Sequence, residues 1–180
     1  MTKLFAVIEN EDVGFSHPAA FYAPTGANRL VAGVPKSDPK VLAQLTESMP
    51  GPFSLLYVLH TPRSEGLPGR YQSPELDLVG VQRFLNEFRA LLMSDGRYDL
   101  WVHCVSSGGT LVWDRHDLIY AYGDLIQYRG VLDREGYVPG ELNIPSPHSH
   151  HYKAENDPEA ARLLSIFPWV RTDLRKEDEQ

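Results

Sequence analysis

Three histidines late in the chain offer side chains of the kind that bind transition metals. His148, His150 and His151 lie within four residues, and Glu155 or Asp157 would add a carboxylate. Neutral imidazoles bind zinc, nickel or copper, and three of them with a water would make a hydrolytic site. In an extended segment, however, His148 and His150 point to one side and His151 to the other. The spacing therefore favours a polar loop that binds no stoichiometric metal, and we expect no cofactor.

The segment from Thr61 to Gln72 combines cationic side chains with unusual length. It follows an apolar run and contains two glycines and two prolines, so we predict an irregular loop. Functional residues concentrate in loops at strand ends, and arginines there suit a carboxylate or phosphate. The predicted ligand- or partner-binding residues are His60, Arg63, Arg70 and Tyr71. The alternative is a mobile loop whose arginines pair with nearby acids.

Two further groups of residues have both a functional and a structural interpretation. The segment from Asp114 to Asp117 holds two carboxylates, a guanidinium and an imidazole, which could serve acid–base chemistry or hold a metal. We interpret it as a turn, because Asp side chains bind the backbone of turns. Five tyrosines would line either a groove or the margin of the core; they are Tyr120, Tyr122, Tyr128, Tyr137 and Tyr152.

The elements that position these residues predict an α+β fold with a mixed or mainly antiparallel sheet. Apolar runs predict strands at residues 4–8, 29–34 and 53–60. Short turns join three later strands into an antiparallel meander, at residues 100–105, 110–113 and 118–122. The region 137–156 is expected to be loop-like.

Helices are expected to pack on this sheet and to begin at capping residues. The predicted caps are Ser37, Ser73 and Asp124, and the last helix is predicted to start at Asp157. The helix that follows Ser73 should run for about 20 residues and bury an apolar stripe that includes Leu85 and Phe88.

Length and composition indicate a single globular domain over residues 1–180, with a flexible charged tail from about residue 171. There are 17 basic and 24 acidic residues, so the formal charge of -7 argues against binding to nucleic acid or an anionic membrane. No apolar run is long enough to span a bilayer. The lone Cys104 excludes an internal disulfide, and without a visible secretory signal we expect a cytoplasmic protein.

These observations favour a binding protein over an enzyme. The first hypothesis is a small acidic interaction domain, for example an inhibitor-type partner of a basic protein, because opposite charge speeds encounter. The first alternative is a metal-assisted hydrolase that uses His148, His150 and His151. The second is a binder of a small anionic ligand through Arg63 and Arg70. Strand order and oligomeric state are not predicted.

Overall fold

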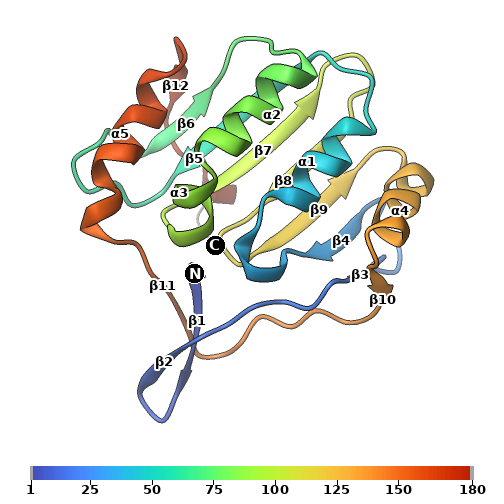
Figure 1. The fold of residues 1–180 in the computed structure, drawn as a ribbon, viewed down its shortest axis with the longest axis horizontal. Helices are drawn as coiled ribbons and strands as arrows, with labels where there is room; N and C mark the ends of the chain where they lie inside the picture. Colours follow the sequence, from blue (N-terminus) through green and yellow to red (C-terminus); the bar gives the residue numbers. More distant parts are fainter. Residues whose placement is uncertain (1, 179–180) are drawn as a thin grey trace.

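The computed structural model describes residues 2–178 and has the predicted α+β fold (Figure 1). Within those residues the larger sheet has nine strands. They are β3 (Ala20–Tyr22), β4 (Leu30–Gly33), β5 (Phe53–Leu59), β6 (Gly69–Gln72), β7 (Tyr98–Cys104), β8 (Thr110–Trp113), β9 (Leu118–Tyr122), β10 (Val138–Pro139) and β12 (Val170–Thr172). Their order in space is β10-β3-β4-β9-β8-β7-β5-β6-β12.

The centre of this sheet is the predicted meander. Strand β7 pairs antiparallel with β8, and β8 pairs antiparallel with β9. The other neighbours are also antiparallel, except β10 and β3, so the sheet is mixed. The chain therefore crosses this region by short turns, as the turn residues predict.

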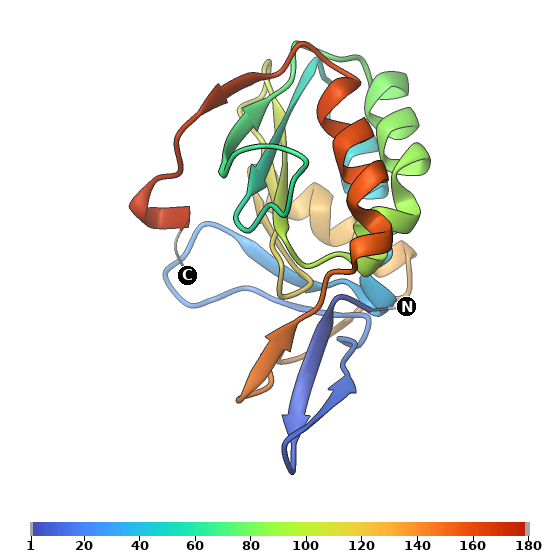
Figure 2. The same cartoon turned by 90° about the vertical axis from the view of Figure 1, so that its left-hand side faces the viewer.

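A second, smaller sheet projects beyond the edge of the larger one (Figure 2). It consists of β1 (Leu4–Ile8), β2 (Glu11–Gly14) and β11 (His148–His150). The expectation that residues 137–156 are loop-like is therefore wrong at β11, which pairs antiparallel with β1. The partner strand comes from the other end of the chain, so local sequence gives no sign of it.

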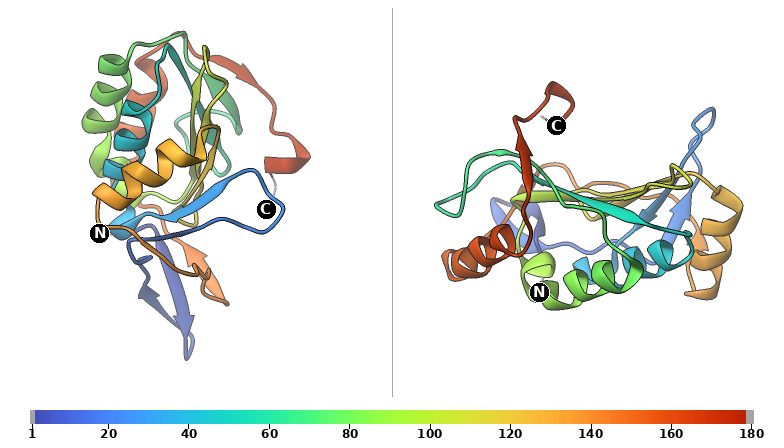
Figure 3. Two further views of the ribbon diagram at one scale, coloured as in Figure 1. Left: turned by 90° about the vertical axis from the view of Figure 1, so that its right-hand side faces the viewer. Right: turned by 90° about the horizontal axis from the view of Figure 1, so that it is seen from above.

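The helices lie on one face of the larger sheet, and within residues 2–178 the opposite face is left open except where the C-terminal segment crosses it (Figures 1 and 3). They are α1 (Lys40–Glu47), α2 (Leu78–Glu87), α3 (Arg89–Ser94), α4 (Leu125–Arg134) and α5 (Asp157–Ser165). Among the described residues, no helix has the length and apolar character needed to cross a membrane.

The alternation of side chains along β7 shows how the two faces differ. Tyr98, Leu100 and Val102 are buried toward the helices, whereas Asp99 and Trp101 are only partly buried. Successive side chains of a strand point to opposite faces. The core therefore lies between the sheet and the helices, and the even-numbered residues of β7 form its centre.

Two of the three predicted helix caps have other roles. The side chain of Asp77, not Ser73, caps α2 by accepting a hydrogen bond from the Gly80 amide at 2.7 Å. Ser73 instead accepts from the amide of Leu55 on β5 at 2.9 Å. Ser37 likewise lies in a short 3-10 turn before α1. In both cases a tertiary contact uses the hydroxyl that the local pattern assigns to a helix.

The long helix predicted after Ser73 is two helices. Phe88, with φ -98° and ψ 12°, separates α2 from α3. Asp124 caps α4 as expected, by accepting from the amide of Gln127 at 3.0 Å. Gly136 follows α4 with φ +80°, a conformation that favours glycine. Helix α5 begins at Asp157, as predicted.

The segment 61–72 is not irregular throughout, because its last four residues form β6 between β5 and β12. Gly69 makes this pairing possible: a Cβ there would meet the carbonyl oxygen of Thr172 at 2.8 Å. At the C-terminal end, β12 pairs with β6, and Asp178 is bound by Arg70. These contacts involve most of the tail that we expected to be flexible, and residues 179–180 lie outside the described range.

A buried ion pair joins the smaller sheet to the larger one. Lys3, just before β1, is fully buried, and its Nζ lies 3.4 Å from Oδ1 of Asp117 in the β8–β9 turn. Its ammonium also lies 4.6 Å from the ring centre of Tyr98 and 4.2 Å from that of Trp113. Asp117 accepts further hydrogen bonds from Ser37 Oγ at 2.5 Å and Trp113 Nε1 at 3.1 Å. Burial raises the pKa of Asp117, and the Lys3 ammonium opposes that rise.

Replacing the buried cation should therefore destabilise the fold strongly. We expect Lys3→Met to lower the free energy of unfolding by about 3–5 kcal/mol, because Asp117 is left charged, buried and without its cation. Adding Asp117→Asn should recover part of the loss, since Asn keeps acceptor oxygens and tolerates the φ of +60° at this position. Urea denaturation of both variants measures the coupling. A loss below about 1 kcal/mol in Lys3→Met would show that the pair is dispensable.

Phe88 tests the packing at the break between α2 and α3. Its side chain is fully buried and packs 5.2 Å from the ring of Phe84. We expect Phe88→Ala to lower the free energy of unfolding by about 3–5 kcal/mol through lost burial and a cavity. An unchanged denaturation midpoint would show that the Phe88 side chain does not contribute to the stability of the core.

Candidate functional site

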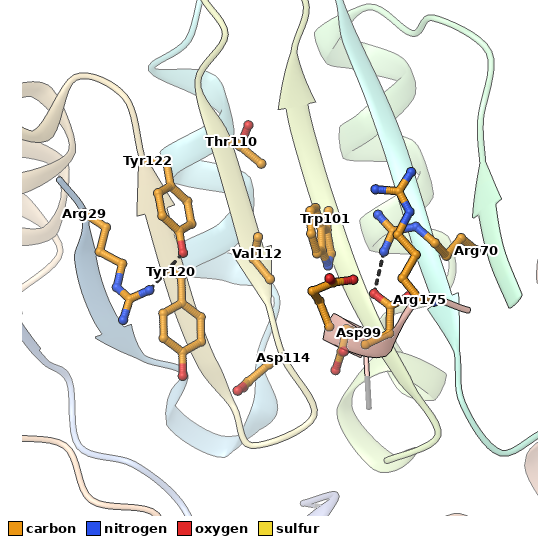
Figure 4. A pocket seen from close by; sticks show the side chains of 12 residues that line it. Arg29, Arg70, Asp99, Trp101, Thr110, Val112, Asp114, Tyr120, Tyr122 and Arg175 are labelled. Atoms are coloured by element: carbon orange, nitrogen blue, oxygen red, sulfur yellow. Dashed lines mark hydrogen bonds and ion pairs between the residues drawn. The ribbon is translucent and has the colours of Figure 1, made fainter. Parts of the chain in front are cut away.

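The uncovered face of the larger sheet contains a cavity of about 820 Å³ (Figure 4). A volume of this size is in the range of ligand-binding clefts. Strands β7, β8 and β9 form its floor, and the C-terminal segment contributes one wall. The lining residues are Arg29, Arg70, Asp99, Trp101, Thr110, Val112, Asp114, Tyr120, Tyr122, Arg175, Glu177 and Asp178.

Two carboxylate residues occupy paired positions on the floor of this cavity. Leu100 and Trp113 are paired between β7 and β8, so the next residues outward, Asp99 and Asp114, come opposite one another. Both belong to the set of alternate residues that points away from the helices. Like charges directly opposite on paired strands repel, and a cation placed between them relieves the repulsion.

Protein donors hold each of these carboxylates. Asp99 accepts from His60 Nε2 at 2.8 Å and from the amide of Arg115 at 2.8 Å. Burial alone would raise the pKa of Asp99, but these hydrogen bonds and the nearby charges lower it below its ordinary value. Asp114 accepts from the amides of His116 and Leu118 at 3.0 and 2.9 Å, as expected for an Asp in a turn. The carboxylate of Asp99 is therefore ionised at neutral pH.

Aromatic rings stacked with arginines form the sides of the cavity. The guanidinium of Arg29 lies 5.2 Å from the ring centre of Tyr120 and donates to the hydroxyl of Tyr122 at 3.1 Å. On the opposite side, the guanidinium of Arg70 lies 5.1 Å from the ring centre of Trp101. Cation–π contacts of this kind hold the planar groups in fixed positions around the opening.

The four residues predicted as a site in and beside the segment 61–72 do not meet in one place. Arg70 lines the cavity but is paired with Asp178. His60 contributes indirectly, through Asp99. Tyr71 points into the core on the other face of β6, and its hydroxyl donates to the carbonyl of Leu67 at 2.7 Å. Strand alternation explains this separation, since neighbours in β6 point to opposite faces.

Arg63 lies outside the cavity, beside a buried charge cluster that the sequence did not reveal. Its Nε is 3.2 Å from Asp157. Arg97 is fully buried and contacts Asp95 at 2.7 Å, Glu65 at 2.6 Å and Asp157 at 3.0 Å. Burial alone would lower the pKa of Arg97, but its hydrogen bonds to Asp95 and Glu65 raise it. The acids near the predicted loop therefore fix its conformation by binding Arg97.

The five tyrosines considered as a groove are divided between three environments. Tyr120 and Tyr122 line the cavity, whereas Tyr128 and Tyr137 are buried in the core. Tyr152 lies near the charge cluster, 5.0 Å from the guanidinium of Arg97. Both interpretations are thus correct for different members, and burial against the helices decides between them.

The histidines also form a group, with one member different from the sequence prediction. Ring centres of His116, His148 and His150 lie 4.9–5.1 Å apart, and one nitrogen from each lies within 4.8 Å of the others. His116 comes from the β8–β9 turn and donates from Nδ1 to Asp114 Oδ2 at 3.1 Å. Burial, with the neighbouring rings, lowers the pKa of His150 to about 3, so that ring is neutral at pH 7.

His151 lies on the other side of the small sheet. Its ring stacks on Phe5 with 3.9 Å between ring centres, and its Nε2 lies 2.6 Å from Asp12 Oδ2. The sequence places His148 and His150 together by strand alternation. It gives no reason to join them to His116, because only the folded chain brings the β8–β9 turn to β11.

Compared with models of protein families, with curated proteins and with solved structures, the chain has no match. Fold alone does not specify function, so the chemistry of the protein's own surface is what indicates its function.

The cluster around Arg97 leads to a prediction about stability with a matched control. We expect Arg97→Met to lower the free energy of unfolding by about 3–5 kcal/mol, because three carboxylates lose their shared cation. Arg63→Ala, which removes a partly exposed arginine bound to the same Asp157, should cost only about 0–1 kcal/mol. Urea denaturation compares the two. Equal losses of unfolding free energy in the two variants would mean that the burial of Arg97 does not increase its contribution to stability.

Proposed function

We propose that this protein is a small binding domain that holds a basic protein partner on the uncovered face of its larger sheet. The observation that carries the proposal is that two acidic residues, Asp99 and Asp114, occupy paired positions of β7 and the end of β8 and line the same cavity. A lysine or arginine side chain of the partner would enter between them. That cation would relieve the repulsion of the two acids and stabilise the bound state.

The surroundings of the carboxylate pair support a protein partner. Tyr120, Tyr122 and Trp101 present rings with a polar atom beside the acids, and tyrosine, tryptophan and arginine are enriched at protein interfaces. Stacked arginines keep these rings in place, so little side-chain freedom is lost on binding. The face is therefore already ordered for a partner before contact.

Overall charge supports a basic partner. The chain carries a formal charge of -7. Opposite net charges raise the rate of encounter and disfavour acidic competitors. This effect acts over about 10 Å in 0.1 M salt, so added salt should slow association.

The chemistry of the lining supports binding rather than nucleophilic catalysis. It supplies carboxylates, guanidiniums and aromatic rings, and in the described part of the chain it has no histidine, cysteine or serine; the one aliphatic hydroxyl, that of Thr110, donates to the carbonyl of Gly108. We also propose a cytoplasmic location. The free thiol of Cys104, which is buried in the core, is compatible with a reducing compartment, where disulfides are rare.

One observation favours the alternative of an anionic ligand in the same cavity. Nε of Arg29 and Nε1 of Trp101 are buried donors without a protein acceptor among the described residues. Buried donors normally have a partner, and a ligand carboxylate would provide one. Arg63 does not belong to this version of the site, because it lies outside the cavity and pairs with Asp157.

Two peptides of opposite charge distinguish the alternatives. We expect an arginine- and lysine-rich peptide of about ten residues to bind, as measured by calorimetry, and a polyglutamate peptide of equal length not to bind. Asp99→Asn should weaken the binding of the basic peptide about fivefold, equivalent to ~1 kcal/mol, because it removes one carboxylate of the pair. Asn keeps one acceptor oxygen for the amide of Arg115, and its NH₂ group can donate to Nε2 of His60 when that nitrogen is the acceptor, so the fold should be retained.

The control is Asp133→Asn on α4, which makes the same change in net charge on the face that carries the helices. Its carboxylate is exposed and lies 3.9 Å from Arg129. Binding should be nearly unchanged in this variant. Equal weakening by both substitutions would mean that only net charge attracts the peptide, and tighter binding of polyglutamate would favour the anionic ligand.

A further inference from the structure

We propose that His116, His148 and His150 form a binding site for one divalent transition-metal ion such as zinc. The site lies where β11 of the smaller sheet meets the β8–β9 turn of the larger one. It replaces the hydrolytic site that the sequence would assign to His148, His150 and His151. It also departs from our expectation that the chain binds no metal, and it does not depend on the proposed binding function.

The distances between the three imidazoles fit a site that needs only small adjustments. One nitrogen of each ring lies within 4.8 Å of the other two. Zinc–nitrogen bonds of 2.0–2.1 Å in a tetrahedral arrangement place ligand nitrogens about 3.3 Å apart. Rotation of the side chains that moves each ligand nitrogen by about 1–1.5 Å would close this difference, and such movements do not require the strands to shift.

Hydrogen bonds fix two of the rings in the form that a metal requires. His116 donates from Nδ1 to Asp114 Oδ2 at 3.1 Å. His148 donates from Nδ1 to the carbonyl oxygen of Pro145 at 3.0 Å. In each ring Nε2 is left as the nitrogen with a free lone pair. Carboxylates and backbone carbonyls are the usual outer partners of histidines that ligate metals.

The third histidine has no competing use within the protein. Nδ1 of His150 is buried and has no hydrogen-bond partner among the described residues. His150 and His148 lie two residues apart on β11, opposite Leu4 and Ala6 of β1. Strand pairing therefore holds both rings on the same side of the small sheet, facing His116.

The electrostatic surroundings can accept a divalent ion. Asp114 provides a negative charge in contact with His116. The cations that act on His150 are Arg115 and Lys3, and Lys3 is paired with Asp117 at 3.4 Å. The three histidines leave a fourth coordination position for water or for a ligand from outside. A bound ion would join the two sheets at a second point, beside the ion pair of Lys3 and Asp117.

Metal titration of tag-free, chelator-treated full-length protein tests the site. We expect calorimetry to show one Zn²⁺ per chain, and zinc to raise the thermal unfolding midpoint. His148→Ala should weaken binding by at least about 100-fold, since loss even of an outer partner costs about 10–100-fold. His148 is exposed, so this variant should fold; its midpoint without metal should match that of the parent. Replacing zinc with Co²⁺ should give the intense visible absorption of a four-coordinate ion.

His151→Ala is the matched control, because His151 is adjacent on the chain but faces Phe5 and Asp12. Zinc affinity should remain within about twofold of the parent in this variant. The proposal is overturned if zinc does not bind with 1:1 stoichiometry. It is also overturned if His151→Ala weakens binding as much as His148→Ala, which would indicate a loose histidine-rich surface, or if His116→Ala leaves the affinity unchanged.

Discussion

Burial of the Lys3 ammonium beside Asp117 determines how the two parts of the molecule fit together. Both side chains are almost completely removed from solvent, at 0% and 1% exposure, and separation would leave either one charged and unpaired. The pair attaches the strand β1 to the β8–β9 turn. Because β11 pairs with β1, the same contact brings His148 and His150 to His116. This ion pair holds the smaller sheet and the histidine group in place, together with backbone contacts such as the hydrogen bond from the amide of Gly96 to the carbonyl of His151.

The β8–β9 turn connects both candidate sites. Asp114 at its start lines the cavity and also binds the imidazole of His116. Asp117 at its end binds Lys3, Ser37 and Trp113. A carboxylate with several donors is held in one orientation, which is what a recognition residue or an outer metal partner needs. A change at this turn should therefore affect the cavity and the histidine group together.

Because the helices pack on only one face of the larger sheet, the other face is open to solvent. Antiparallel sheets can leave one face exposed, with polar and apolar residues alternating along each strand. Here that exposed face carries aromatic rings held by arginines, and two carboxylate residues at paired strand positions. Arg97 makes a comparable contribution on the covered side, where it holds residue Glu65 of the long loop to α5 through Asp157. Buried arginines and their acids thus fix the loops, and the open face remains available for contact.

Local patterns in the sequence were sufficient for the α+β class, the meander, the cap at Asp124 and the start of the last helix at Asp157. Each depends on neighbours within a few residues: apolar alternation, short turns and side chains that bind nearby amides. Tertiary contacts decided the rest. Ser73 binds β5 instead of capping a helix, β11 forms because β1 lies beside it, and His116 joins histidines more than thirty positions away. Which face of the sheet is covered also depends on the whole chain. The alternation of side chains defines two faces, and only the packing of the helices decides which of them becomes the core.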